Sequence, residues 1–291
     1  MLKPFTLHEP ATVAEASSLL GKYGEAARLY AGGTELVLVM KQGLAHYPHL
    51  VNVKQIPGLS GVRQHGGVLH IGAGTTHRAI EKNPLILDRL PRLAGLEEGV
   101  ANVRVRNVGT LGGNLAFAEP HADPGTLLLA LGAGVRVQRG DRIRRIPLGE
   151  FFVDAYTTAL EPEEVLVEVD VPLPPPGTEA VFLKFGFLER PSVNVAAVLS
   201  SSDGTVREAR VAVGCVGPKP IRCQTAEAVL AGVPVREIPS AAQAAGARAA
   251  HEIDPIQDLH GSADFKRHIT AVLVRRSITA AAARLGGGTG A

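Results

Sequence analysis

The stretch RNVGTLGGNLAFAEPHADPGTLLLAL, residues 106–131, combines four glycines, two prolines and a leucine run. Glycine loses the most backbone entropy when it is ordered, so such a cluster marks a tight turn, a surface loop, or a place where backbone must come close to something bulky. Its centre, GTLGGN (Gly109–Asn114), offers backbone without side-chain bulk, a hydroxyl and an amide. Taken alone, this segment is most simply interpreted as a turn.

A second glycine segment, AGGTEL (Ala31–Leu36), follows an apolar strand pattern, ARLY. Two glycines and a threonine there would expose consecutive backbone N–H groups, and such a concavity favours phosphate. A plain β-turn is the simpler interpretation of this segment alone. It matches neither the G-x-G-x-x-G fingerprint nor a P-loop. Together, however, the two loops could clasp a pyrophosphate from both sides.

Two charged residues have open interpretations. Asp123 could accept hydrogen bonds from sugar hydroxyls, or cap a helix that has Pro124 at its first position. Lys184, in the apolar strand pattern AVFLKFGF, is either a solvated edge-strand residue or a deliberately placed charge.

Composition narrows the class of protein. The chain has 291 residues, enough for two packed units. Its 30 basic and 28 acidic residues give a net charge of +2, which supplies no electrostatic reason to expect nucleic acid or an anionic membrane as partner. The N-terminus has no apolar signal region and no apolar run reaches ~18 residues. We therefore expect a cytoplasmic protein in which Cys215 and Cys223 are free thiols.

The sequence contains no motif that indicates a metal site or an acyl-transfer site. The ten histidines show no metal-type spacing, and no G-x-S-x-G occurs. His77 and His121 lie near the glycine segments and are interpreted as polar loop residues.

Local signals predict several elements. Thr12 and Glu15 have the spacing of a capping box at the start of a helix. Hairpins are predicted to turn at Gly66–Gly67 and at Gly140–Asp141. The proline-rich segment 173–180 is the best linker candidate, with a domain boundary near residue 176.

Taken together, AGGTEL, GAGTTHRAI (residues 72–80) and the 106–131 segment resemble the flavoprotein subunits of the molybdenum hydroxylases. These are the medium subunits of carbon monoxide dehydrogenase type enzymes, and the FAD region of xanthine dehydrogenase is similar. The resemblance implies an α+β fold. It consists of a two-subdomain PCMH-type (vanillyl-alcohol-oxidase-like) FAD-binding domain at 1–175, with subdomains at about 1–55 and 56–175. A smaller α/β C-terminal domain with an antiparallel sheet and helices follows at 178–285, then a flexible tail at 286–291.

The resemblance also implies non-covalent FAD held between the two subdomains. The first loop would hold the pyrophosphate through backbone N–H groups and Thr34, and the second would close from the other side. Asp123 would lie near sugar or ribityl hydroxyls, Leu166 near the flavin or adenine edge, and Lys184 near the flavin, where a cation stabilises a reduced anionic ring. The implied FAD-binding residues are Leu29, Tyr30, Ala31, Gly32, Gly33, Thr34, Glu35, Leu36, Thr76, Gly109, Thr110, Gly112, Gly113, Asn114, Ala118, Asp123, Leu166 and Lys184.

The implied function is electron relay without a catalytic or metal-ligating residue in this chain. A large molybdenum-cofactor subunit and a small subunit with two [2Fe-2S] clusters would be partners, in a dimer of heterotrimers. The external acceptor would be NAD, a quinone or oxygen. Two alternatives stay open: a stand-alone FAD-dependent reductase or oxidase of the same fold, and a non-catalytic nucleotide-binding scaffold.

Overall fold

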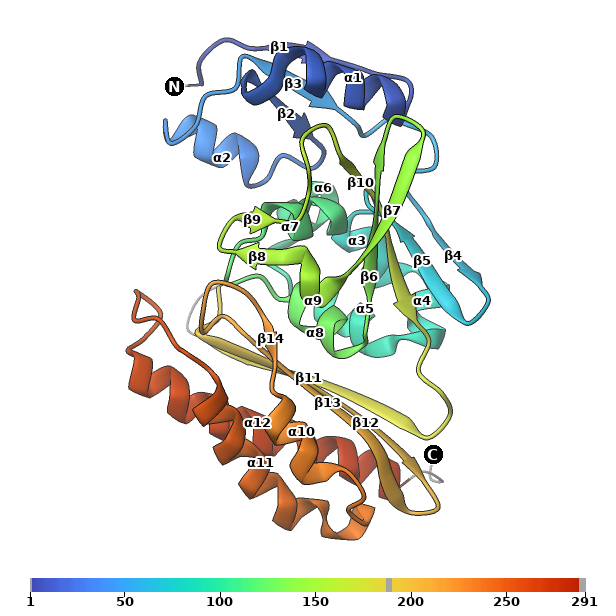
Figure 1. The fold of residues 1–291 in the computed structure, drawn as a ribbon, viewed down its shortest axis with the longest axis vertical. Coiled ribbons are helices and arrows are strands. Elements are labelled where there is room, and N and C mark those ends of the chain that lie inside the picture. The colour runs from blue at the N-terminus through green and yellow to red at the C-terminus, as the bar shows by residue number, and fades with distance from the viewer. Residues whose placement is uncertain (1, 187–189, 288–291) are drawn as a thin grey trace. The chain divides into compact units, whose positions relative to one another are not determined.

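Contacts between residues divide the chain into two units. The structure, a computed structural model, describes residues 2–186 and 190–287. The first unit comprises the residues up to 118 together with 134–171, and the second comprises 119–133 together with the residues from 172 onward. The segment 119–133 lies inside the predicted FAD-binding domain but packs with the second unit, so the chain passes between the units three times rather than once (Figure 1).

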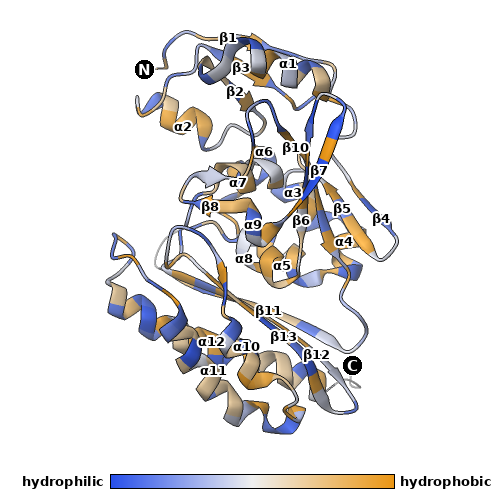
Figure 2. Cartoon of the chain, in the orientation of Figure 1, coloured by the Kyte–Doolittle hydropathy of each residue, from blue (hydrophilic) through white to orange (hydrophobic). Residues whose placement is uncertain are grey.

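The first unit begins with a small parallel sheet of strand order β1-β3-β2. The helix before β2 starts where the sequence predicts: the Thr12 hydroxyl accepts a hydrogen bond from the N–H of Glu15 at 3.1 Å. Short helix α2 is almost entirely apolar (Figure 2). The elements are β1 (Thr6–His8), α1 (Val13–Tyr23), η1 (Gly24–Ala26), β2 (Ala27–Tyr30), α2 (Leu36–Lys41) and β3 (His49–Asn52).

A five-stranded sheet of order β4-β5-β10-β6-β7 and a two-stranded sheet of β8 and β9 form the rest of the first unit, together with short helices. Both predicted hairpins are confirmed, since His65 pairs with Val68 and Arg139 with Arg142. The elements are β4 (Val62–His65), β5 (Val68–Gly72), α3 (His77–Lys82), α4 (Pro84–Arg89), α5 (Pro91–Glu98), α6 (Val103–Val108), α7 (Leu111–Phe117), β6 (Gly134–Arg139), β7 (Arg142–Pro147), α9 (Leu148–Phe151), β8 (Phe152–Asp154), β9 (Thr157–Thr158) and β10 (Val165–Pro172).

The second unit is an antiparallel sheet of order β11-β12-β13-β14 with helices on it. Alternate residues of a strand point to opposite faces, and in β12 the residues Val193, Val195, Ala197 and Leu199 join the core that α10, α11 and α12 cover. Helix α8 packs against β12 and β13, which explains why 119–133 belongs here. The elements are α8 (Pro124–Ala130), β11 (Thr178–Phe185), β12 (Val193–Ser202), β13 (Thr205–Gly214), β14 (Ile221–Arg222), α10 (Gln224–Leu230), η2 (Val235–Glu237), α11 (Ile238–Glu252) and α12 (Ala263–Gly286).

The predicted α+β class is confirmed: the sheet of β1, β3 and β2 is parallel, and the two hairpins and the sheet of the second unit are antiparallel. Cys215 and Cys223 are buried free thiols, as expected, and burial raises the pKa of the Cys223 thiol to about 12. Residues 288–291 of the predicted tail, and 187–189 after the strand that carries Lys184, lie outside the described residues.

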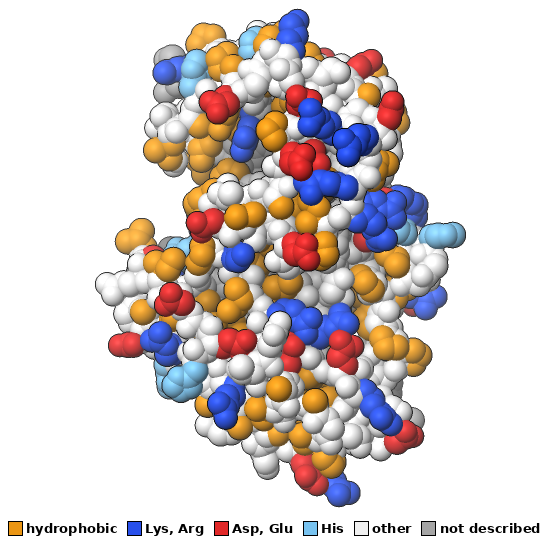
Figure 3. Space-filling model, in the orientation of Figure 1, with side chains coloured by type: hydrophobic (Ala, Val, Ile, Leu, Met, Phe, Trp, Pro, Cys, Tyr) orange, Lys and Arg blue, Asp and Glu red, His pale blue; other side chains and the backbone are white. Residues whose placement is uncertain are grey.

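The surface agrees with the balanced composition. On the face drawn in Figure 3, basic and acidic side chains are interspersed. Within the described ranges, no helix combines the length and the apolar character needed to cross a membrane.

Candidate cofactor-binding site

The two glycine segments, far apart in sequence, lie in direct backbone contact within the first unit. A Cβ added to Gly32 would overlap the carbonyl oxygen of Val108 and come within 2.6 Å of the Cα of Gly109. A Cβ added to Gly109 would in turn lie 3.5 Å from the hydroxyl oxygen of Thr34. Side-chain bulk at Gly32 would therefore drive the two loops apart.

The first loop keeps its backbone donors available. In the described part of the chain, the N–H groups of Gly32, Gly33 and Thr34 have no protein hydrogen-bond acceptor. Gly33 has φ +71°, a left-handed conformation that glycine adopts without strain, and a Cβ there would also overlap the ring of Tyr30. Consecutive free N–H groups in such a turn form a site for an anionic group.

The second loop differs from this pattern. The backbone N–H groups of residues 111–114 donate to oxygens of Ala73, Thr75 and Thr110 at 2.9 to 3.0 Å, so they are already occupied. The bonds to Ala73 and Thr75 tie α7 to the chain that follows β5. The second loop therefore contributes mainly close approach. The N–H of Thr110 has no protein acceptor among the described residues, and the Asn114 amide remains as well, because its Oδ1 is buried without a hydrogen-bond partner.

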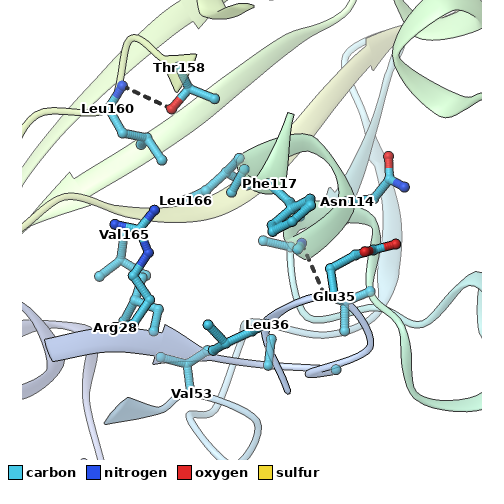
Figure 4. Close-up of a pocket in the computed structure, with 18 of the residues that line it drawn as sticks. Arg28, Glu35, Leu36, Val53, Asn114, Phe117, Thr158, Leu160, Val165 and Leu166 are labelled. Atoms are coloured by element: carbon cyan, nitrogen blue, oxygen red, sulfur yellow. Dashed lines mark hydrogen bonds between the residues drawn. The ribbon is translucent and has the colours of Figure 1, made fainter. Parts of the chain in front are cut away.

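A cavity of about 680 Å³ opens beside these loops, a size typical of small-molecule sites. Figure 4 shows Leu36 and Val53 on one side of it, Val165 and Leu166 on another, and Phe117 of α7 facing them. The apolar walls suit a planar ring, while the glycine loops supply the polar end. Most predicted FAD-binding residues line the cavity, namely Leu29, Ala31, Gly32, Gly33, Thr34, Glu35, Leu36, Thr110, Gly112, Gly113, Asn114 and Leu166.

Four other predicted residues are not among the cavity-lining residues but shape its wall. Tyr30 packs its ring under Gly33. Thr76 caps α3, accepting from the N–H of Ala79 at 3.1 Å. Gly109 accepts from the backbone N–H of His77 at 3.0 Å, and Ala118 ends α7 in a left-handed conformation with φ 51°. These positions support the lining rather than form it.

The last two predicted residues, Asp123 and Lys184, lie together in the second unit. Asp123 precedes α8, with Pro124 first in the helix as predicted, but its side chain makes no capping hydrogen bond. The carboxylate instead accepts from Nζ of Lys184 at 2.6 Å and from Nδ2 of Asn194 at 2.9 Å. The Lys184 ammonium group is a stronger hydrogen-bond donor to a buried carboxylate than a helix N–H is. The capping interpretation of Asp123 was therefore wrong. Of the two interpretations of Lys184, the structure favours the one in which its charge has a specific partner.

Some cavity residues escaped the sequence analysis. Arg28, Tyr47 and Tyr156 line the cavity, and no local motif marks them. His121 is a turn residue as expected, bonded to Glu119 at 3.2 Å. His77 is not a loop residue: it is the first residue of α3, is 3% exposed, and lines the cavity.

The cavity segment 159–164 is held by a clamp from β7. Arg144 donates to both carboxylate oxygens of Glu164 at 2.6 and 2.7 Å and to the carbonyl of Ala159 at 2.8 Å. Burial alone would raise the pKa of Glu164, but hydrogen bonds from Arg144 and from the backbone N–H of Glu161 lower the pKa below 4.5.

A pH-dependent contribution to stability follows from this clamp. Because the pKa of Glu164 is lower in the folded chain, its contribution is fully present above about pH 4.5 and is lost as the pH falls below that value. Arg144 is 42% exposed, so we expect only about 1 kcal/mol. Urea unfolding of Glu164→Gln and the unchanged chain should show a gap in unfolding free energy at pH 7 that narrows as the pH falls below about 4.5. A gap that stays constant with pH would contradict this reading.

The unpaired N–H groups, the glycine contact that excludes a Cβ, the orphan oxygen of Asn114 and the apolar walls together fit a nucleotide cofactor with a diphosphate bridge. By fold and site, the chain is a nucleotide-cofactor-binding protein.

Comparison with known proteins identifies the family to which this cofactor-binding chain belongs. Residues 3–174 match the family described as FAD binding domain in molybdopterin dehydrogenase, and residues 190–281 match the CO dehydrogenase flavoprotein C-terminal domain. The chain belongs to this family, the FAD-binding flavoprotein subunits of the molybdenum hydroxylases, which are oxidoreductase subunits. The family membership that the glycine segments indicated is confirmed. FAD is the cofactor of this family.

Individual relatives span the whole chain. It is 35% identical to the carbon monoxide dehydrogenase medium chain of Hydrogenophaga pseudoflava, covering 98% of this chain and 99% of that one. It is 34% identical to the nicotine 6-hydroxylase medium subunit of Paenarthrobacter nicotinovorans, covering 94% and 96%. Among solved structures, the carbon monoxide dehydrogenase of H. pseudoflava that lacks the Mo-pyranopterin moiety matches with a TM-score of 0.94, at 36% identity over 98% and 99%.

Proposed function

We propose that this chain carries non-covalent FAD and relays electrons within a molybdenum hydroxylase, from iron–sulfur clusters of a partner subunit to an external acceptor. The observation that carries the proposal is the backbone contact between the two glycine loops at the edge of a single cavity. Bound FAD would supply the chemistry, since it accepts electrons singly and delivers them in pairs.

The chain's own residues bind and orient the cofactor. The N–H groups of Gly32, Gly33 and Thr34 would donate to the diphosphate, and the Asn114 amide would bond a neighbouring polar group of the cofactor. The apolar walls around Leu36 and Leu166 would exclude water from a ring system.

The partners belong to the proposal. With only two cysteines, the chain cannot bind a four-cysteine cluster itself. We propose a small subunit with two [2Fe-2S] clusters and a large molybdenum-cofactor subunit, assembled as a dimer of heterotrimers in the cytoplasm. NAD, a quinone or oxygen would accept the electrons. The relatives named for carbon monoxide and for nicotine indicate that the substrate is not determined by this subunit.

Purification tests the proposal directly. The full-length chain should be yellow, or take up FAD at micromolar concentration, and should release intact FAD on heat denaturation. In the complex with its partner subunits, substrate should bleach the flavin absorbance. A colourless chain without FAD uptake would contradict the proposal. Turnover of a small organic substrate by the isolated chain would favour the stand-alone oxidoreductase, and a flavin that never bleaches in the complex would favour the scaffold.

The predicted position of Lys184 near the flavin has its own test. Lys184→Ala should keep FAD but lower its midpoint potential by about 30 mV or more, equivalent to roughly 1.4 kcal/mol for a two-electron couple, because a nearby cation favours the reduced anionic ring. Lys184→Arg, which keeps the charge beside Asp123, should leave the potential close to its original value. An unchanged potential in the alanine variant would remove Lys184 from the flavin's neighbourhood.

A further inference from the structure

His77 lies against the second glycine loop and lines the cavity. Its backbone N–H donates to the carbonyl of Gly109 at 3.0 Å. Its ring carbon Cδ2 lies 3.2 Å from where a Cβ on Gly109 would stand, so the imidazole borders the glycine at the point where the two loops meet. The ring is therefore placed at the polar end of the cavity.

A buried carboxylate fixes this ring. Nδ1 of His77 lies 2.6 Å from Oε2 of Glu97, and the two side chains are 3% and 0% exposed. Since Nδ1 faces this carboxylate, the other ring nitrogen, Nε2, is the group left for a ligand. In the residues that the structure describes, Nε2 of His77 has no protein hydrogen-bond partner.

Burial favours a His77–Glu97 pair that carries no net charge. Oε1 of Glu97 is buried without a hydrogen-bond partner, so His77 is the group that compensates this carboxylate. A net charge is costly to bury, and the pair is neutral when it holds one hydrogen between Nδ1 and Oε2 and a second on Nε2. Nε2 then carries a hydrogen and donates toward the cavity.

An anionic diphosphate needs such a donor at this end. Among the described residues that line the cavity, the basic side chains are those of Arg28 and His77. Arg28 stands over the ring of Tyr47, 5.6 Å from its centroid, and Figure 4 shows it beside Val165, away from Asn114. The N–H groups of residues 111–114 are occupied, as described above, so His77 adds a side-chain donor beside this loop.

We propose that His77, held in place by Glu97, donates a charge-assisted hydrogen bond from Nε2 to a diphosphate oxygen of FAD. This inference rests on the proposed function, because it requires FAD in the cavity. It assigns a side-chain donor to a loop in which the N–H groups of residues 111–114 are already occupied.

The test compares ligands that differ in the diphosphate. Dissociation constants of the full-length chain are measured for FAD, for ADP and for adenosine, with the flavin midpoint potential and Tm as further readouts. His77→Gln should weaken FAD and ADP by the same factor, about 10- to 100-fold, as expected for loss of a charge-assisted hydrogen bond. Adenosine, which has no phosphate, should bind as before, and the potential should not move.

Two further variants separate this role from folding. Removing His77 alone leaves Glu97 without its hydrogen-bond partner. The double variant His77→Gln/Glu97→Gln keeps a neutral hydrogen-bonded pair and should show the same loss of FAD and ADP. The matched control is His70→Gln, which breaks another buried pair, to Asp170 at 2.6 Å, outside the cavity lining. That control should lower Tm without changing FAD affinity.

The outcomes distinguish the inference from the proposed function. If the unchanged chain binds no FAD, the proposed function fails and the inference with it. If the unchanged chain binds FAD and both His77 variants bind it equally well, only the inference fails. An equal loss of adenosine and ADP would mean general damage to the cavity, and a shifted potential with unchanged affinity would place His77 at the flavin ring. Either result would overturn the inference.

Discussion

Replacing Gly32 with alanine is expected to abolish measurable FAD binding, a loss of more than about 1000-fold. The added methyl would overlap the carbonyl oxygen of Val108 and approach the Cα of Gly109, and both are backbone atoms that no rotamer change can move. The two loops must move apart to make room for the methyl group, which costs about 1–3 kcal/mol of folding free energy. It also displaces the free N–H groups of the first loop, and a binding site displaced in this way loses every hydrogen bond at once.

Isothermal titration with FAD and thermal unfolding together measure the Gly32 effect. We expect Tm to fall by only ~5 °C while binding disappears. Gly95→Ala is the control: Gly95 lies in α5 with open space where its Cβ would stand, so alanine there should bind FAD normally and be slightly more stable. Normal FAD binding by Gly32→Ala would show that the contact between the loops is irrelevant to the cofactor.

Asp170→Asn is expected to destabilise the first unit by about 3–5 kcal/mol, the usual cost of breaking a buried ion pair from one side. Asp170 is 2% exposed on β10. Its carboxylate accepts from His70 at 2.6 Å, from Nε of Arg136 at 3.0 Å, and from Arg145. Without it, these three groups face one another with less opposing charge.

The same cluster explains an acid limit to stability. Burial alone would raise the pKa of Asp170, but hydrogen bonds from His70 and Arg136 and the charges of Arg136 and Arg145 lower the pKa below 3.8. The stabilisation is thus present above about pH 3.8 and is lost as the pH falls further. Denaturant unfolding at pH 7 tests the variant, with the exposed Asp88→Asn as control, which should change stability by less than about 0.5 kcal/mol. A loss below 1 kcal/mol for Asp170→Asn would contradict the account.

The geometry of this cluster could also suit a metal ion, because ligand atoms of His70, Glu168 and Asp170 all lie within 4.8 Å of one another. The carboxylates, however, are already paired with guanidinium groups: Arg63 lies 2.5 Å from Glu168, and Arg136 contacts both acids. With Arg145, which also pairs with Asp170, three guanidinium groups neutralise the acids and repel a cation. We interpret the cluster as a structural ion-pair network of the five-stranded sheet.

Local features were predictable because the residues that create them are neighbours in sequence. Thr12 caps its helix through an N–H three residues away, and the glycines at 66–67 turn a hairpin through their own positive φ angles. The glycine segments predicted an anion site for the same reason, since their chemistry is that of the backbone itself.

Long-range partners were not predictable from a single sequence. The capping interpretation of Asp123 failed because Lys184, 61 residues away, supplies a stronger partner than the helix N–H. His77 looked like an ordinary loop residue because Glu97 belongs to another helix. Likewise, the second loop looked like a source of bare amides because nothing in its sequence shows that Ala73 and Thr75 take them.

A structure of the full-length chain with FAD bound tests the central claim most directly. The account predicts diphosphate oxygens 2.7–3.2 Å from the backbone nitrogens of Gly32, Gly33 or Thr34, with the two glycine loops still in contact. A diphosphate bound elsewhere, with those nitrogens facing only water, would contradict it.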